Sequence, residues 1–238
     1  MNPTTARLVI PCYRDGARLA AYLPDLCTAL SRSGGYTRVQ VVDDGSPPAG
    51  QDHLAAVVEG LRRVHDFLEP LIAHPRNHGK GHAIRAGWDA GPEPAWLAFV
   101  DADGAVPPAE VVVLLELARR SPQPAVFIAD RTVPAGRRVR RFWHRRLGSR
   151  LFNAWVRFCL RLDYPDTQCG LKVIPASLYH SGTWREEGFA FDLELLLRAR
   201  AAGVPVVVQP IAWQEKPGST VGVGAMLGLF RAAWRLRR

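Results

Sequence analysis

The chain has 238 residues, of which 47% are hydrophobic and 22% charged, and its formal net charge is +9. This composition excludes a disordered chain, and the length fits one domain or a domain with a small appendage. Because the sequence contains no apolar run long enough to span a bilayer and no signal peptide, a cytoplasmic protein is expected. The four cysteines lack the paired spacing of metal sites and are expected to be reduced thiols in the core: Cys12, Cys27, Cys159 and Cys169.

The positive charge is concentrated in two places. Residues 137–161 contain nine arginines and no acid, and residues 221–238 add four more arginines, again with no acid. Localised charge of this kind indicates an anionic partner, which could be phosphate, a membrane surface or nucleic acid.

Short apolar runs alternate with helical patterns along the chain. The runs lie at 8–10, 39–42, 71–73, 96–100, 125–128 and 204–208, and the helical patterns near 16–31, 51–68, 80–90 and 108–120. Alternation of this kind predicts an α/β fold with a mainly parallel central sheet and helices on both faces. We divide the chain into a main domain over residues 1–220 and a basic amphipathic tail over residues 221–238.

Two carboxylates follow the apolar run at 96–100. If the strand persists, Asp101 and Asp103 point to the same face, at the carboxyl end of the sheet where ligands bind in open α/β folds. Two hard oxygen ligands suit Mg²⁺ or Mn²⁺. The alternative is an ordinary acidic turn. An EF-hand is excluded, because Ala105 and Val106 stand where that loop needs an oxygen ligand and a glycine.

A second acidic pair, Asp43 and Asp44, follows the run at 39–42 and precedes Gly45 and Ser46. A carboxylate there could accept hydrogen bonds from a nucleobase edge or a ribose hydroxyl. The alternative is a helix-capping turn, which Asp and Ser favour in any case.

A glycine-rich segment, Asn77-His78-Gly79-Lys80-Gly81, precedes a predicted helix. Glycines allow close backbone approach, a helix start favours anions and Lys80 supplies a charge, so the segment suits a diphosphate. It is not a Walker loop, and a flexible turn with a solvated lysine is the alternative. Arg131 follows the fifth run and could reach the same crevice.

The arginine-rich segment has a helical period. On a helical wheel one face collects Trp143, Leu147, Leu151, Ala154, Trp155 and Phe158, and a stripe beside it collects Arg146, Arg150, Arg157 and Arg161. This pattern predicts an amphipathic basic helix of the kind that binds membrane surfaces. The alternative is a helix that docks on the domain through its apolar face. The tail from residue 226 has a similar, shorter pattern.

Together the motifs resemble the inverting family 2 glycosyltransferases with a glycosyltransferase A-type fold, over nearly the whole chain. The motifs lie at 41–46, 77–85, 101–105, 166–172, 191–196 and 213–219. The last three are typical of the branch that contains dolichyl-phosphate β-glucosyltransferases and bacterial polyprenyl-phosphate relatives. Ala105 stands where mannose enzymes of this kind carry an amide, so the glucose branch fits better. The sequence departs from the family pattern at Arg14-Asp15, where Asn-Glu is usual, and at Thr220, where lysine is usual.

The resemblance implies an enzyme that transfers a hexose, expected to be glucose, from a UDP-sugar to a polyprenyl phosphate, using Mg²⁺ or Mn²⁺. Residues 1–220 would then be the catalytic domain. It assigns catalysis to Asp103, Asp192 and Arg131, and the metal to Asp101 and Asp103. The donor side comprises Pro11, Tyr13, Asp43, Asp44, Gly45, Asn77, Gly79, Lys80, Asp101, Asp103 and Arg131. The acceptor side comprises Arg145, Gln168, Lys172, Asp192, Glu194 and Glu215.

Other functions are also open. Alternatives within the enzyme class are a GDP-mannose donor or a soluble hydroxyl acceptor. An alternative of another class is a non-catalytic basic module that binds nucleic acid, but no aromatic stacking array accompanies the arginines and an acidic crevice would repel that ligand. We therefore expect a nucleotide-sugar donor, a polyprenyl phosphate acceptor, an anionic membrane surface and no nucleic acid as partners. The expected location is cytoplasmic, peripheral on the inner face of the membrane.

Overall fold

The computed structural model describes residues 6–34, 37–132, 139–140, 143–214, 216 and 223–237, and for 139–140, 143–150 and 223–227 the description is limited to the backbone. The elements follow in the order β1 (Ala6–Cys12), α1 (Gly16–Arg32), β2 (Thr37–Asp43), α2 (Pro48–Arg62), β3 (Ile72–Ala73), α3 (Lys80–Trp88), β4 (Trp96–Val100), α4 (Pro108–Arg119), β5 (Val126–Asp130), β6 (Val139–Arg140), α5 (Trp143–Leu160), β7 (Leu171–Pro175), α6 (Ala176–His180), α7 (Phe191–Ala201), β8 (Val206–Pro210), β9 (Trp213–Gln214) and α8 (Val223–Arg235).

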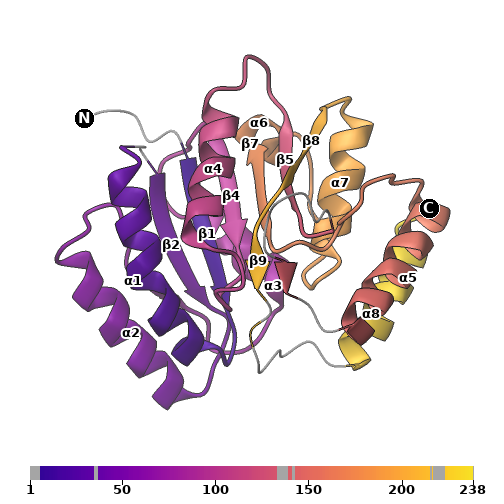
Figure 1. The fold of residues 1–238 in the computed structure, drawn as a ribbon. Coiled ribbons are helices and arrows are strands. Elements are labelled where there is room, and N and C mark those ends of the chain that lie inside the picture. Colours follow the sequence, from indigo (N-terminus) through magenta and orange to yellow (C-terminus); the bar gives the residue numbers. More distant parts are fainter. Residues whose placement is uncertain are drawn as a thin grey trace.

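A seven-stranded sheet in the order β3-β2-β1-β4-β7-β5-β8 forms the centre of the molecule (Figure 1). Strand β7 runs antiparallel to both β4 and β5, and the other pairs are parallel. The prediction of a mainly parallel sheet is confirmed. Strand β7 was not predicted, because Lys172 interrupts a short apolar run there. A small parallel pair of β6 and β9 lies apart from this sheet.

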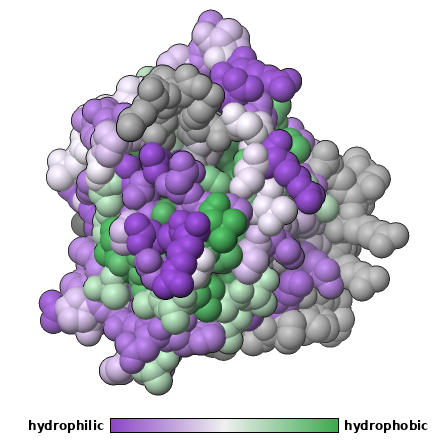
Figure 2. Space-filling view, turned by 90° about the vertical axis from the view of Figure 1, so that its left-hand side faces the viewer, coloured by the Kyte–Doolittle hydropathy of each residue, from purple (hydrophilic) through white to green (hydrophobic). Residues whose placement is uncertain are grey.

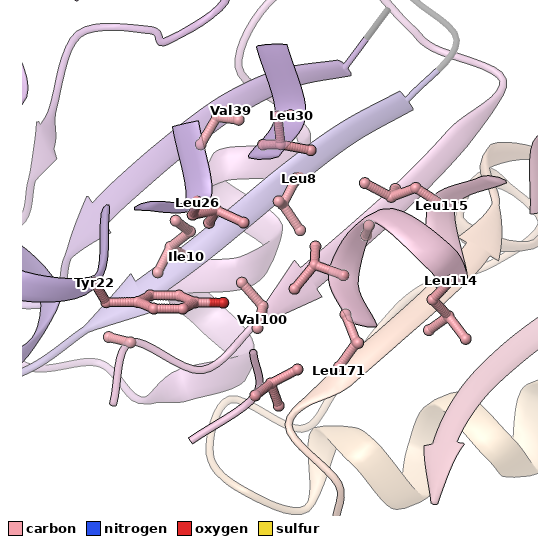
Figure 3. Packing of buried hydrophobic residues seen from close by; sticks show 14 of the residues in the cluster. Leu8, Ile10, Tyr22, Leu26, Leu30, Val39, Val100, Leu114, Leu115 and Leu171 are labelled. Atoms are coloured by element: carbon pink, nitrogen blue, oxygen red, sulfur yellow. The ribbon is translucent and has the colours of Figure 1, made fainter. Parts of the chain in front are cut away.

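Helices cover both faces of the sheet, as predicted. Alternating side chains of β1 separate the two cores: Leu8 and Ile10 pack under α1, α2 and α4, whereas Val9 packs toward α3. The second core continues through α7 to the α5–α8 pair. Figure 3 shows the first core, in which α1 and α4 contribute Tyr22, Leu26, Leu30, Leu114 and Leu115. All four cysteines are free and buried, which confirms their predicted place in the core.

Helices α5 and α8 lie side by side at the edge of the molecule (Figure 1). Trp155 of α5 stacks on Trp234 of α8, with ring centroids 6.1 Å apart. The side of α5 that packs on the body carries Phe152 and Val156, and Trp155 of the predicted apolar face is partly buried against the same core. Docking through the predicted apolar face therefore stays a prediction, because the side chains of Trp143 and Leu147 lie outside those that are described.

Two side chains of that predicted face are exposed instead: Leu151 by 61% and Phe158 by 76%. Trp234 on the neighbouring helix is 50% exposed. Figure 2 shows a different side of the molecule, the one at the left of Figure 1, where hydrophilic side chains surround small apolar areas. Within the described part of the chain, no helix is both long and apolar enough to cross a bilayer.

Candidate active site

The candidate site lies at the carboxyl edge of the sheet. The register pairs Cys12 with Asp43, so β1 and β2 end together, and β4 runs parallel beside β1. Because β7 is antiparallel, its first residue, Leu171, pairs with Val100 at the end of β4. The sheet thus brings segments 43–46, 101–105 and 166–172 to one edge, although they are far apart in the sequence.

Asp101 and Asp103 lie at this edge, but not by strand alternation. Strand β4 ends at Val100, so the expectation of a strand persisting to both carboxylates is wrong. Asp101 is instead held by its backbone N–H, which donates to Gly170 O at 2.8 Å. Asp103 lies in the following turn, and its Oδ1 accepts a hydrogen bond from Ala105 N at 2.9 Å.

The two carboxylates fit a divalent cation. The Asp101 side chain is 40% exposed and can be reached from solvent. Burial and the neighbouring Asp101 raise the pKa of Asp103. Burial would also raise the pKa of Asp101, but the ammonium of Lys80 holds it below the usual range. The negative charge of Asp101 makes it harder for Asp103 to lose its proton. A hard divalent cation bound between the two carboxylates would offset this repulsion and stabilise both in their charged forms.

Two carboxylates do not fill the shell of such an ion. Among the described residues, no group of three or more His, Cys, Asp or Glu side chains is arranged to hold a metal. Mg²⁺ commonly binds through one or two protein carboxylates and completes its shell with phosphate oxygens and water. Asp101 and Asp103 would therefore hold Mg²⁺ or Mn²⁺ together with a donor diphosphate.

A chain of alternating charges leads from Asp101 into the protein. Lys80, the first residue of α3, places Nζ 2.8 Å from Asp101 Oδ1 and 3.2 Å from Asp192 Oδ2. The other Asp192 oxygen pairs with Nζ of Lys172, which also donates to Cys169 O at 2.7 Å. Both ammonium groups lie over the ring of Phe99, at 5.0 Å for Lys80 and 5.5 Å for Lys172.

This arrangement defines what Lys80 and Asp192 can do. Lys80 is not a solvated lysine on a flexible turn, since its side chain is only 9% exposed and doubly paired. Burial alone would lower the pKa of Lys80, but Asp101 and Asp192 raise it above its usual value, so the lysine is charged. Asp192 is 1% exposed with both oxygens paired to lysines, so it orients cations and offers no free oxygen as a base.

Asp44 organises the glycine-rich segment. Its carboxylate accepts hydrogen bonds from Asn77 Nδ2 at 2.9 Å, His78 N at 3.1 Å and Gly79 N at 2.6 Å. Gly45 has φ of +79°, and a β-carbon there would overlap the backbone of Arg76. Asp44, Gly45 and Asn77 therefore shape the loop, and their predicted contact with the donor stays a prediction.

Asp43 has one oxygen engaged and one without a partner. Oδ1 accepts from Ser46 N at 2.7 Å and Gln51 Nε2 at 3.1 Å, as in the predicted capping turn. Oδ2 is buried and has no hydrogen-bond partner within the described chain. A buried acceptor without a donor is costly, so this oxygen is suited to a donor group from a ligand.

Arg131 is fixed by an acid. Its guanidinium forms a bidentate pair with Asp166, with Nε 2.6 Å from Oδ2 and Nη2 2.9 Å from Oδ1, and lies 5.4 Å from the Trp213 ring. Burial would lower the pKa of Arg131, but Asp166 raises it, so the group is always charged. Donor contact and catalysis by Arg131 stay predictions, and Asp166, which anchors this guanidinium, is not among the site residues expected from the sequence.

Glu194 is part of the scaffold. Its carboxylate accepts hydrogen bonds from the backbone N–H groups of Arg185 and Glu186 at 3.0 and 2.7 Å, and from Arg198. It thereby fixes the loop at 184–190, which the sequence analysis did not single out. Carbonyls of this loop lie 2.5 Å from where β-carbons would stand at Gly79 and Gly81, so only glycine fits at either position. Direct acceptor contact by Glu194 stays a prediction.

The remaining predicted site residues are less defined. Pro11 lies near the end of β1, the Tyr13 ring lies 5.1 Å from the Arg14 guanidinium, and Gln168 Nε2 makes a long contact of 3.5 Å to Thr167 O. Arg145 lies on α5 where only the backbone is described, and Glu215 lies outside the described residues. Contacts of these residues with donor or acceptor stay predictions.

Comparison with known proteins identifies the class. The profile of glycosyl transferase family 2 matches residues 8–181. The chain belongs to this family and is a glycosyltransferase, which confirms the resemblance seen in the motifs.

Individual relatives refine the comparison. A dolichyl-phosphate β-glucosyltransferase of Saccharomyces cerevisiae is 26% identical over 230 residues, covering 91% of this chain and 69% of the relative. A polyprenol monophosphomannose synthase of Mycolicibacterium smegmatis is 28% identical over 251 residues, covering 100% and 89%. Among solved structures, glucosyl-3-phosphoglycerate synthase from Mycobacterium tuberculosis superposes with a TM-score of 0.70 at 14% identity, covering 98% of this chain and 78% of that one. The glycosyltransferase A-type fold is thus confirmed.

Proposed function

We propose that the protein transfers glucose, with inversion, from a UDP-sugar to a polyprenyl phosphate, using Mg²⁺ or Mn²⁺ held by Asp101 and Asp103. The observation that carries the proposal is the pairing of Asp101 with the buried Lys80 at the carboxyl edge of the sheet, where Asp103 lies close enough to Asp101 for the two carboxylates to interact. A divalent cation and a lysine side by side suit a diphosphate leaving group. The names of both sequence relatives specify a polyprenyl-type phosphate acceptor, which supports the acceptor class.

Mannose from GDP-mannose is the second candidate, because the mycobacterial relative is a mannose enzyme and aligns over the whole chain. Ala105, in place of the amide of mannose enzymes, favours glucose. The nucleotide would lie against β1 and β2, where the unpartnered Asp43 Oδ2 accepts a hydrogen bond from the base or the ribose.

The acceptor's own acidity removes the need for a general base. A phosphate monoester has a second pKa of about 6, so it is largely a dianion at neutral pH and already a nucleophile. The protein's task is then to align two anions. The bound metal would stabilise the charge that grows on the leaving diphosphate. Lys80 and Lys172, oriented by Asp192, and Arg131, anchored by Asp166, supply fixed positive charge.

We further propose that the α5–α8 pair rests on an anionic membrane surface, peripheral on the cytoplasmic side. The exposed side chains Leu151, Phe158 and Trp234 offer an apolar contact, and Arg157 on α5 and Arg161 directly after its end are exposed as well. Apolar anchors flanked by arginines are suited to the boundary of anionic lipid headgroups. A polyprenyl acceptor is itself a lipid, so this placement brings the site to its substrate.

A panel of sugar nucleotides tests the donor. With Mn²⁺ present, UDP-glucose at a hundred times its dissociation constant should stabilise the fold by about 2.7 kcal/mol, measured as a thermal shift, and GDP-mannose should not. Incubation with radiolabelled UDP-glucose and a short-chain polyprenyl phosphate should then give a labelled lipid. Stabilisation by GDP-mannose alone would assign the mannose reaction, and transfer only to hydroxyl acceptors would refute the lipid phosphate.

A further inference from the structure

The ammonium group of Lys80 is paired with Asp101, one of the two carboxylates proposed to bind the metal. Its Nζ lies 2.8 Å from Asp101 Oδ1, and the Asp101 side chain is 40% exposed while that of Lys80 is 9% exposed. Asp101 is thus neutralised from its protein side and open on the other. A lysine and a divalent cation cannot both fully neutralise one carboxylate, because each repels the other.

The same ammonium has a second anchor. Asp192 Oδ2 lies 3.2 Å from Lys80 Nζ, and Lys172 holds the other oxygen of Asp192 from within the core. Asp192 and Lys172 belong to α7 and to the central strand β7, and both side chains are buried. Lys80 can therefore release Asp101 without becoming an unpaired buried charge.

From this geometry we propose that Lys80 is a built-in counter-ion that metal binding displaces from Asp101. Without metal, Lys80 bridges Asp101 and Asp192. When a divalent cation binds Asp101, Lys80 stays on Asp192 and its freed N–H groups turn to the donor diphosphate. Asp192 and Lys172 are positioning residues for this lysine. The proposal rests on the proposed function for the identity of the donor, but the exchange itself concerns only the metal and the protein.

The first test is metal binding without donor or acceptor. Mn²⁺ binding, measured by electron paramagnetic resonance, should be about tenfold tighter for Lys80→Met than for wild type, because the competing ammonium is gone. Lys172→Met also removes one positive charge near Asp101 but does not contact it. If the loss of any nearby positive charge were enough, Mn²⁺ binding would tighten equally in both variants. If Mn²⁺ has to displace the Lys80 ammonium from Asp101, binding tightens mainly in Lys80→Met.

A charge-matched control lies elsewhere. Arg120→Gln removes a cation that is 75% exposed and paired with Glu116. Arg120 lies at the C-terminal end of α4, and the N-terminal end of this helix, which follows the acidic motif, is about 18 Å away. It should leave Mn²⁺ binding unchanged. Mn²⁺ should also raise the melting temperature of Lys80→Met more than that of wild type, since Asp101 lacks its directly paired ammonium group in the metal-free variant.

The wild-type protein provides a second measurement that needs no folded variant. The chain contains three lysines, Lys80, Lys172 and Lys216, so ¹⁵N-lysine labelling gives a simple NMR spectrum of ammonium groups. Saturating Mg²⁺ should shift the Lys80 resonance and leave that of the exposed Lys216 in place. The proposal would be overturned if Lys80→Met bound Mn²⁺ no more tightly than wild type, or if neither protein bound it measurably. It would also be overturned if Mg²⁺ did not move the Lys80 resonance. None of these readouts depends on sugar transfer, so a failure of the proposed function would be seen separately.

Discussion

Gly170 gives the Asp101 carboxylate the space in which it lies. The two residues share a backbone hydrogen bond of 2.8 Å, and a β-carbon on Gly170 would overlap Oδ2 of Asp101. Gly170 also joins the end of segment 166–169 to β7, so the glycine couples the position of Asp101 to that of Lys172.

Gly170→Ala should therefore disturb the metal site directly. We expect a loss of about 1–3 kcal/mol in unfolding free energy from overpacking, and at least a tenfold loss of Mn²⁺-dependent transfer because Asp101 must move. Chemical denaturation and initial rates measure the two effects. Gly60→Ala is the control, since a β-carbon at this position in α2 meets nothing within 4 Å and should leave the rate unchanged. Equal rates for wild type and Gly170→Ala would disprove the tight fit.

Replacing the carboxylates separates their contributions. Asp103→Asn should abolish turnover and Asp101→Asn should weaken it severely, because each removes a charged oxygen ligand from a cation bound to phosphate. Initial rates with and without EDTA provide the measurement, and re-addition of Mn²⁺ to the chelated wild type is the control. If both variants kept wild-type rates in EDTA, the metal role would be wrong.

The raised pKa of Asp103 sets a pH dependence for metal affinity. A carboxyl group with a raised pKa takes up a proton at a higher pH than the ordinary value of about 4, and a protonated Asp103 is a poor ligand. Mn²⁺ affinity should therefore be full at neutral pH and fall as the pH drops, beginning above the range of an ordinary aspartate. Titrations of Mn²⁺ at several pH values test this. An affinity that stays constant down to pH 4 would contradict the assignment.

Asp192→Asn should act through stability and geometry rather than proton transfer. The substitution leaves two buried lysines without their shared counter-charge, and breaking such pairs costs about 3–5 kcal/mol. We expect a large drop in melting temperature and in kcat, but no loss of an acidic limb from the pH–rate profile with a short-chain polyprenyl phosphate. The contrary result would be a wild-type pH–rate profile with a group that must be deprotonated, whose pKa differs from that of the acceptor, and the loss of this group in Asp192→Asn. Asp192 would then be a general base, and a hydroxyl acceptor would be favoured.

The α5–α8 surface should determine membrane binding. Phe158→Ser combined with Trp234→Ser should reduce co-sedimentation with anionic vesicles, and Arg157→Gln with Arg161→Gln should reduce it further, since each basic residue contributes about 1 kcal/mol near such a surface. Val64→Ser, which removes an apolar side chain that is 77% exposed beyond α2, is the matched control. Wild-type protein that sediments equally with neutral and anionic vesicles would argue against the electrostatic part.

Local patterns predicted most of the sheet, because buried parallel strands are short apolar runs that end in polar turns. They failed at β7, whose second residue, Lys172, is fully buried, because only the fold supplies Asp192 as its partner. On α5 the helical wheel shows which side chains are apolar but not which of them meet the body, where Phe152 and Val156 are buried and Phe158 is exposed. The acidic motifs identified the edge of the sheet. Asp44 binds the backbone of a loop more than thirty residues further along the chain, whereas Asp43 keeps one oxygen without a partner among the described residues. No local pattern contains this difference, because the loop is distant in the sequence.

The last helix reaches further into the molecule than its position at the end of the chain suggests. Arg235 of α8 donates to Glu186 at 2.7 Å, and Glu186 belongs to the loop whose carbonyls lie against Gly79 and Gly81. A chain shortened at residue 220 would thus lose an outside brace on the loop that backs Lys80. Loop 184–190 would therefore contact, on one side, the helix that is proposed to bind lipid and, on the other, the glycines of the proposed nucleotide site.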